Sequence, residues 1–197
     1  MEKNITEHRY KVDVRQRRQL NSHNSFLVFF TGLSGSGKST LANALEQQLF
    51  GMGIRTYVLD GDNIRKGINK GLSFSPDDRS ENNRRIGEIS KLFVDAGVVV
   101  LAAFVAPYNR DRMFIRETVG FENYVEVFVD TTLEECERRD VKGLYKMARE
   151  GKISDLTGVS APYETPVNPD VTISNESTVH ESTNLILSII SKKLQLR

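Results

Sequence analysis

Apolar and polar positions follow two alternating patterns along the chain. Short, almost continuously apolar runs predict buried parallel strands, and segments with apolar residues every three or four positions predict amphipathic helices. The predicted strands cover residues 26–30, 55–60, 98–105, 124–129 and 171–174, and the clearest helices cover residues 40–50, 78–96 and 179–194. Because strands and helices alternate, the predicted fold class is α/β: a five-stranded parallel sheet with helices on both faces, in a three-layer sandwich.

Length and composition are those of one ordinary globular domain. The chain has 197 residues, of which 39% are hydrophobic and 27% are charged. Residues 1–25 are polar and are predicted to form an N-terminal arm, with Arg15, Arg17 and Arg18 on a short helix, whereas residues 26–197 form the folded domain. We expect the arm to be solvated, or else to pack on a neighbouring subunit or over the active site.

Net charge and the rarest residue types exclude several classes of function. The net charge is +1, so no global attraction to nucleic acid or to a membrane surface is expected. The single cysteine, Cys136, excludes an internal disulfide, and His8, His23 and His180 are scattered, so we expect them at the surface and not in a metal site. No apolar run resembles a signal segment or a membrane span, which predicts a cytoplasmic protein without a membrane partner.

A glycine-rich stretch between the first predicted strand and the following helix matches the pattern Gly-x-x-x-x-Gly-Lys-Ser/Thr. In such a turn, successive backbone N–H groups and the helix N-terminus bind a phosphate chain. Lys38 is expected to bind the β- and γ-phosphates of ATP, and Ser39 to bind Mg²⁺. The predicted ATP-binding residues are Gly32, Leu33, Ser34, Gly35, Ser36, Gly37, Lys38, Ser39 and Thr40.

Two carboxylates follow the second predicted strand, in the stretch Asp60-Gly61-Asp62. Ligands bind at the carboxyl ends of the strands in an open parallel sheet, so we expect both acids to face the phosphate-binding turn. Phosphoryl transfer to a hydroxyl needs a group that accepts its proton, and either acid fits this role while the other orients the water shell of Mg²⁺. The predicted catalytic residues are therefore Lys38, Asp60 and Asp62, with the roles of the two acids left open.

Two further segments are rich in cationic side chains. The helix predicted at 78–96 follows the aromatic residue Phe74 and begins with groups that bind anions, namely Arg79, Asn82, Asn83, Arg84 and Arg85. Residues 133–169 carry Arg138, Arg139, Lys142, Lys146, Arg149 and Lys152 and little apolar material, which favours a mobile cationic lid over a solvent-exposed connection. Combined with the phosphate-binding turn and the acids, these segments predict a P-loop kinase of a small molecule.

Several longer stretches resemble the adenylylsulfate kinase family. They are residues 30–40, 59–65, 74–85, 140–145 and 162–164, and the resemblance runs in register over nearly the whole chain after residue 20. It implies transfer of the γ-phosphate of ATP to the ribose 3′-hydroxyl of adenylyl sulfate, which gives 3′-phosphoadenylyl sulfate. The resemblance also implies a substrate site whose residues, in our prediction, are Asp60, Asp62, Asn63, Arg65, Phe74, Arg79, Asn82, Arg85, Val105, Ala106, Lys142 and Leu156.

Two positions depart from the pattern of that family. Ala106 stands before Pro107-Tyr108 where the family usually has serine, and Leu156 stands before Thr157-Gly158 where it usually has phenylalanine. If the adenine of the substrate lies on Phe74, Leu156 offers its other face apolar contact without π-stacking. We therefore expect activity with weaker adenylyl sulfate binding, by about 1 kcal/mol or more for the lost stacking face.

Two other classes of function stay open at this point. One is a P-loop kinase of another small alcohol or nucleoside, and the other is a nucleotide-binding regulator without catalysis. A GTPase is disfavoured, because the sequence has no Asn-Lys-x-Asp stretch for guanine. Among partners, a homodimer and functional coupling to an ATP sulfurylase are further expectations that the sequence does not decide.

Overall fold

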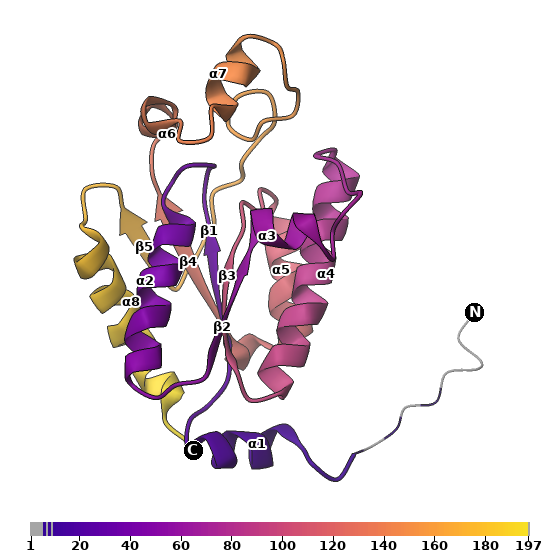
Figure 1. Cartoon of the computed structure of the whole chain (residues 1–197), viewed down its shortest axis with the longest axis vertical. Helices are drawn as coiled ribbons and strands as arrows, with labels where there is room; N and C mark the ends of the chain where they lie inside the picture. The colour runs from indigo at the N-terminus through magenta and orange to yellow at the C-terminus, as the bar shows by residue number, and fades with distance from the viewer. Residues whose placement is uncertain (1–5, 7, 9, 197) are drawn as a thin grey trace.

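A five-stranded, all-parallel sheet forms the centre of the protein (Figure 1). The computed structural model describes residues 6, 8 and 10–196, so the predicted arm lies partly outside the described residues. The strands have the spatial order β2-β3-β1-β4-β5, and each neighbouring pair is parallel. Their bounds are β1 Leu27–Thr31, β2 Thr56–Asp60, β3 Val99–Ala103, β4 Tyr124–Asp130 and β5 Val171–Ser174, which confirms the five predicted strands.

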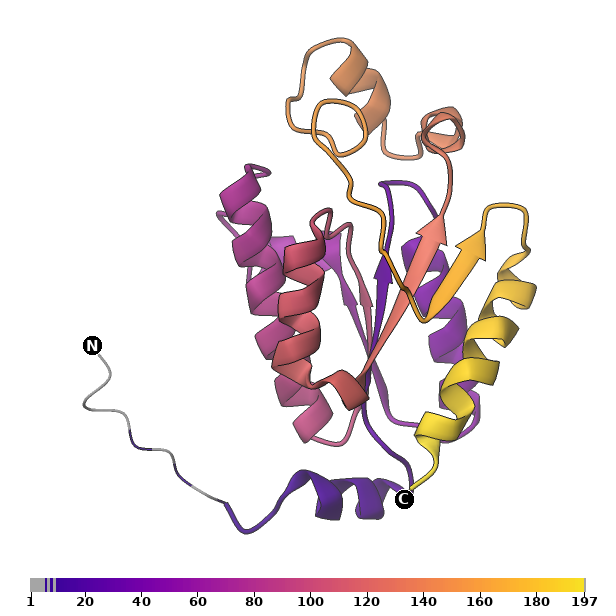
Figure 2. The ribbon, with the colours of Figure 1, turned by 180° about the vertical axis from the view of Figure 1, so that it is seen from behind.

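Helices cover both faces of the sheet, so the three-layer prediction is also confirmed (Figures 1 and 2). Helices α2 (Lys38–Gly51) and α8 (Val179–Leu194) lie on one face, and α4 (Pro76–Asp95) and α5 (Asn109–Val119) lie on the other. A short helix α3 (Gly61–Lys66) follows β2, and a 3₁₀ turn η1 (Phe121–Asn123) precedes β4. The sequence did not predict α3, because six residues are too few to show a helical period.

The alternation of side chains along β1 explains why its sequence is apolar without interruption. All five of its residues are buried. Val28 and Phe30 pack in the core cluster that includes residues of α2 and α8, whereas Leu27 and Phe29 pack in the cluster that includes residues of α4 and α5. A strand covered on both faces must be apolar on both, which is the pattern of a parallel sheet between two helical layers.

Helices α2 and α4 each begin two residues earlier than predicted. The side chain of Ser75 caps α4 by accepting a hydrogen bond from the N–H of Asp78, and Pro76 fits the first helical turn. Helix α2 begins at Lys38, directly after Gly37. In both helices the first turn carries polar side chains, so the apolar period begins only in the second turn.

The described part of the predicted arm forms helix α1 (Val14–Asn21), which packs on its own domain. Arg17 donates a 2.8 Å hydrogen bond to the carboxylate of Asp95 at the end of α4. Arg18 donates to the hydroxyl of Ser25 over 2.8 Å, and Asn21 donates to the backbone of Gly97. These contacts lie where the strands begin, so these residues do not lie over the active site; no residue of α1 is buried, so the helix stays largely solvated as expected.

One histidine prediction also needs correction. His8 and His180 are exposed as expected, but His23 is buried. Its Nδ1 lies 2.7 Å from the carbonyl of Asn24, and its Nε2 accepts a 3.0 Å hydrogen bond from the N–H of Arg55. One donor and one acceptor fit the neutral imidazole, so His23 satisfies backbone groups inside the fold.

Residues 133–169 are called the lid below; its helices lie beyond the carboxyl end of the sheet, and its last residues return alongside the sheet to the start of β5 (Figures 1 and 2). The lid contains α6 (Leu133–Arg139) and α7 (Leu144–Arg149). Contrary to the prediction of little apolar material, Cys136, Tyr145 and Leu156 form a buried cluster here, the lid cluster, with Leu33 and Leu133 packed against it. The lid is therefore packed onto the phosphate-binding turn. Within the described residues, no helix combines the length and the apolarity needed to cross a bilayer.

Candidate active site

The phosphate-binding turn, called the phosphate loop below (residues 32–39), joins the end of β1 to the start of α2. Gly32 has φ of +150°, and a Cβ at this position would lie 2.6 Å from the carbonyl oxygen of Val129 in β4. Gly37 caps α2 with φ of +107°. These backbone conformations and this close approach require glycine, so the loop can turn tightly and present its N–H groups at the start of a helix.

Lys38 is almost completely buried beneath this loop, with 8% of its surface exposed. Its ammonium group donates to the carbonyl oxygens of Leu33 over 2.7 Å and Gly32 over 3.1 Å. Burial lowers the pKa of Lys38 to about 8, and the nearby ammonium of Lys142 acts in the same direction. An anion that entered the loop would therefore favour the charged form of Lys38.

The two predicted acids at the end of β2 have different partners. Asp60 accepts a 2.6 Å hydrogen bond from the hydroxyl of Ser39 and a 3.0 Å bond from the N–H of Asp62. The carboxylate of Asp62 instead forms an ion pair with Lys142 of the lid, and its side chain is 62% exposed. Asp60 is thus tied to the predicted magnesium residue, whereas Asp62 faces the lid.

A cavity of about 580 Å³ lies between the phosphate loop, the ends of β2 and β3, the start of α4 and the lid. It brings together residues that are as far apart in sequence as Ser34 and Thr157. The predicted site residues that line it are Ser34, Gly35, Gly37, Lys38, Ser39, Thr40, Asp60, Asp62, Arg65, Phe74, Arg79, Asn82, Val105, Ala106, Lys142 and Leu156.

The remaining predicted residues lie outside this lining. Gly32, Leu33 and Ser36 belong to the loop itself but do not line the cavity, and Asn63 is exposed on α3. Arg85 forms a 2.7 Å ion pair with Glu81 one turn earlier in α4. This i, i+4 spacing favours the pair within the helix, so Arg85 is held away from the cavity.

Phe74 is the aromatic surface of the cavity, and 55% of it is exposed. The guanidinium of Arg65 lies over its ring, 4.3 Å from the centroid, and that of Arg79 lies 5.4 Å away. Arg79 also donates over 2.8 Å to the carbonyl of Phe74 and over 2.5 Å to that of Asp155 in the lid. This wall combines positive charge with a flat apolar face, a chemistry that suits an anionic nucleotide.

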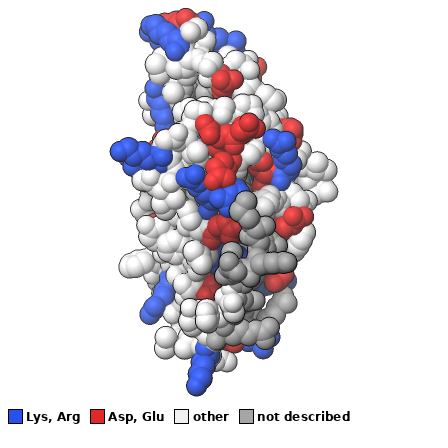
Figure 3. Space-filling model, turned by 90° about the vertical axis from the view of Figure 1, so that its right-hand side faces the viewer, with Lys and Arg blue, Asp and Glu red and all other residues white. Residues whose placement is uncertain are grey.

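Most cations of the lid do not reach the cavity, which corrects the prediction of a cationic lid. Arg138 and Arg139 both pair with Glu135 over 2.7 Å. Arg149 pairs with Glu137 and Lys152 with Glu150. Figure 3 shows a similar mixture of charges on the side of the molecule where α4 lies, with basic and acidic side chains next to one another. Of the predicted lid cations, Lys142 lines the cavity.

The structure also places residues near the site to which the sequence assigned no role. Tyr145 in α7 donates a 2.8 Å hydrogen bond to the carbonyl of Ser34, so the lid touches the phosphate loop directly. Asn69 donates over 2.9 Å to the amide oxygen of Asn82. Asn83, which the sequence predicted among the anion-binding groups, donates over 3.0 Å to Asp111 of α5. Tyr145 stands in one of the stretches that carry the family resemblance, which was the available signal.

These features define the class of protein. A parallel sheet whose phosphate loop follows the central strand, with two acids at the end of the edge strand β2 and a lid above, is the architecture of a P-loop kinase. The family model described as Adenylylsulphate kinase matches residues 24–174, and the chain belongs to this family.

Individual relatives agree with this assignment over most of their length. The chain is 56% identical over 170 residues to an adenylyl-sulfate kinase of Lactiplantibacillus plantarum, which covers 86% of this chain and 82% of that protein. It is 51% identical to an adenylyl-sulfate kinase of Staphylococcus epidermidis, with 95% of each covered. Among solved structures, the APS kinase of Mycobacterium tuberculosis in complex with AMPPNP and APS has a TM-score of 0.83 and 42% identity, covering 85% of this chain and 98% of that one.

Proposed function

We propose that this kinase transfers the γ-phosphate of ATP to the ribose 3′-hydroxyl of adenylyl sulfate, giving ADP and 3′-phosphoadenylyl sulfate. One observation carries the proposal: a single cavity joins the phosphate loop to the wall made by Phe74, Arg65 and Arg79. The similar kinase of Mycobacterium tuberculosis was solved with AMPPNP and APS together. The cavity is accordingly assigned to both substrates, ATP at the loop and adenylyl sulfate at the wall.

On the donor side, the loop N–H groups and Lys38 hold the β- and γ-phosphates of ATP. Entering phosphate oxygens replace the carbonyls of Gly32 and Leu33 as partners of the Lys38 ammonium. Ser39 and Asp60 offer two oxygen atoms 2.6 Å apart, donors of the kind that Mg²⁺ prefers beside phosphates and water. Bound magnesium would supply neutralisation of the charge on the transferred phosphate.

On the acceptor side, Asp62 is assigned as the group that accepts the proton of the 3′-hydroxyl. Asp60 is occupied by Ser39, whereas the exposed Asp62 carboxylate is free to exchange its partner Lys142 for a substrate hydroxyl. The ammonium of Lys142, released from Asp62, then pairs with the phosphoryl group that is transferred. The different partners of Asp60 and Asp62 support this assignment of roles, which the sequence left open.

The nucleotide of the acceptor is placed against Phe74. Stacking of a base on an aromatic ring contributes about 1 to 3 kcal/mol, and the guanidinium groups of Arg65 and Arg79 complement phosphate and sulfate. Leu156 lines the same cavity from the lid. Asn63 and Arg85 do not line the cavity, so their predicted contact with the substrate requires that they move on binding.

The cellular role and the partners of the protein are proposed from this reaction. The proposed reaction is a step of sulfate activation in the cytoplasm and uses ATP and Mg²⁺. An ATP sulfurylase is proposed as the enzyme that supplies adenylyl sulfate. We also propose that the protein forms a homodimer.

A coupled assay of ADP release tests the function directly. The purified chain is given ATP and Mg²⁺ with adenylyl sulfate, and in parallel with AMP, adenosine or a small sugar acid as acceptor. We expect turnover with adenylyl sulfate to exceed that with every other acceptor. Preference for another acceptor would support the alternative small-alcohol or nucleoside kinase, and ATP binding without turnover would support a non-catalytic regulator.

A further inference from the structure

The turn after β3 forms part of the cavity wall in a conformation that its sequence disfavours. Val105, Ala106 and Pro107 line the cavity. Ala106 has φ of +41°, in the left-handed region that residues with a Cβ rarely adopt. Such a conformation persists only where surrounding contacts enforce it. The contacts that hold this turn therefore shape the acceptor side of the cavity.

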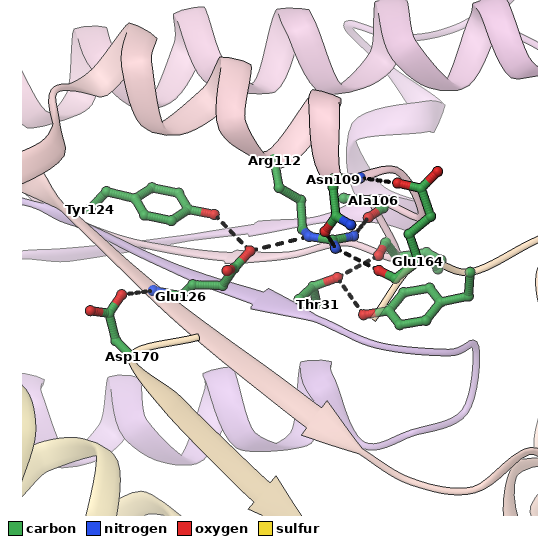
Figure 4. A network of polar contacts seen from close by, with 10 residues as sticks. Thr31, Ala106, Asn109, Arg112, Tyr124, Glu126, Glu164 and Asp170 are labelled. Carbon is green, nitrogen blue, oxygen red and sulfur yellow. Dashed lines mark hydrogen bonds and ion pairs between the residues drawn. The ribbon is translucent and has the colours of Figure 1, made fainter. Parts of the chain in front are cut away.

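Arg112 of α5 makes the central contacts to this turn (Figure 4). Its side chain is buried, and one terminal nitrogen donates a 2.6 Å hydrogen bond to the carbonyl of Ala106. The other terminal nitrogen donates to the carbonyl of Glu164 over 2.5 Å and to the side chain of Asn109. A planar guanidinium can hold these groups at once, which the single ammonium of a lysine cannot.

Glu164 belongs to the segment in which the chain returns from the lid to the sheet. Its N–H donates a 2.8 Å hydrogen bond to the carbonyl of Pro107, and its carboxylate accepts a 2.7 Å bond from the N–H of Asn109. On the sheet side, Thr31 donates to the carbonyl of Val105 over 2.7 Å, and its hydroxyl lies 2.9 Å from that of Tyr163. The cavity turn and the returning lid segment are thus joined in one network.

Glu126 of β4 supplies the opposite charge for Arg112 (Figure 4). Its carboxylate lies 3.2 Å from Nε of Arg112, and both residues are buried. The backbone N–H of Glu126 donates over 2.8 Å to Asp170, which anchors this part of β4 to the start of β5. A buried arginine without a partner would be costly, so Glu126 keeps Arg112 in place beneath the turn.

We propose that Arg112, held by Glu126, is a positioning residue for the acceptor: it fixes the Val105–Pro107 turn and ties it to the end of the lid. This inference rests on the proposed function, because it takes adenylyl sulfate as the occupant of that part of the cavity. Neither Arg112 nor Glu126 lines the cavity, so both act through the turn. The phosphate loop makes no contact with Arg112 in the hydrogen bonds and ion pairs of the described residues, and ATP binding is accordingly independent of it.

The test compares Arg112→Lys and Glu126→Gln with the wild-type chain. Both variants keep most of the side-chain volume but lose the guanidinium fork or its counter-charge. We expect KM for adenylyl sulfate to rise by about tenfold or more in Arg112→Lys, and in the same direction in Glu126→Gln, while KM for ATP stays within about twofold. Amide hydrogen exchange of Asn109 and Glu164 should become faster in both variants.

Arg116→Lys is the matched control, because Arg116 lies one turn further along α5 and stacks on Phe121 and Tyr124 without touching the turn. It should change neither KM nor the two exchange rates. Equal rises in both KM values, or faster exchange without a change in KM for adenylyl sulfate, would overturn the positioning role. If Arg112→Lys proves unstable to heat, the same KM and exchange measurements on Glu126→Gln and Thr31→Val test the positioning role, since each variant removes one support of the same turn.

Failure of the proposed function gives a different result. In that case the wild-type chain itself shows no turnover with adenylyl sulfate. The exchange rates of Asn109 and Glu164 still report whether Arg112 holds the turn, and the acceptor found in the ADP-release assay then replaces adenylyl sulfate in the KM comparison. Unchanged exchange rates in Arg112→Lys and Glu126→Gln would overturn the inference for any acceptor.

Discussion

The hydroxyl of Ser39 donates a 2.6 Å hydrogen bond to Asp60, which joins the first turn of α2 to the end of β2. Asp62, two residues further on, pairs with Lys142 of the lid instead. Two acids that look equivalent in the sequence therefore have different partners, which supports the proposed division between a metal-and-donor side and an acceptor side of the cavity.

The first prediction concerns this division between the acids. Asp62→Asn should lower kcat by about 10²- to 10⁴-fold, the usual contribution of general base catalysis, with little change in the Kd for ATP. Asp60→Asn should chiefly weaken magnesium-dependent ATP binding. Single-turnover rates and ATP titrations at several magnesium concentrations measure both effects. If Asp62→Asn changes only the affinity for ATP, Asp62 is the acid on the magnesium side and Asp60 is the proton acceptor.

The second prediction uses the charge of Lys38. Lys38→Ala should abolish phosphoryl transfer, because the buried ammonium beneath the loop is the charge assigned to the phosphate oxygens of ATP. The fold should survive, since the hydrogen bonds of Lys38 are to carbonyls of the loop itself. Circular dichroism and thermal unfolding check the fold, and ADP release checks the activity. Near-normal turnover in a folded variant would refute the assignment of the phosphate loop.

The third prediction is a pH dependence of ATP binding. The pKa of Lys38 is about 8 in the ligand-free protein, so at that pH about half of the molecules carry a neutral amine. A bound triphosphate favours the charged form and raises this pKa, so binding near pH 8 should take up protons. The apparent affinity for ATP should then fall as the pH rises through 8, and should be flat well below it.

Calorimetry in buffers with different ionisation enthalpies measures this uptake. Lys38→Arg is the matched control, because a guanidinium stays charged throughout this range and should show no proton uptake from residue 38. An identical proton count in the variant and the wild-type chain would assign the uptake to ATP or to another group.

The fourth prediction concerns contact between the lid and the phosphate loop. Tyr145→Phe removes the 2.8 Å hydrogen bond to the carbonyl of Ser34 and keeps the packing of the ring in the lid cluster. One such bond contributes about 0.5 to 1.5 kcal/mol, so ATP should bind about two- to twelvefold more weakly. Tyr57→Phe, on a half-exposed ring in the edge strand β2, should leave the affinity unchanged. Equal affinities in all three proteins would show that the bond does not support the loop.

The fifth prediction concerns Leu156, which lines the cavity although only 9% of it is exposed. Leu156→Phe should tighten adenylyl sulfate binding by up to about 1 to 2 kcal/mol through stacking, part of which is lost to crowding in the lid cluster. ATP affinity should barely move. Leu156→Met, which keeps the volume, should bind as the wild-type chain does. Equal affinities for the leucine and phenylalanine proteins would show that residue 156 does not face the adenine.

The sequence by itself determined the architecture and the donor side of the site. Short, almost continuously apolar runs indicate buried parallel strands, and β1, β3 and β4 are indeed buried along nearly their whole length. The phosphate loop was equally readable, because the positive φ angles of this turn restrict positions such as Gly32 and Gly37 to glycine. Both signals are local, since each depends on residues that are adjacent in the chain.

Only the tertiary structure decided which charged groups are available to a substrate. Arg85 and Arg138 look like anion-binding residues in the sequence, but Glu81 and Glu135 neutralise them within their own helices. Lys142, from the same stretch as Arg138, reaches across the cavity to Asp62. The burial of His23 and the support of the cavity turn by Arg112 were hidden for the same reason: a side chain's partner, and hence its free charge, is set by segments far away in the sequence that folding brings into contact.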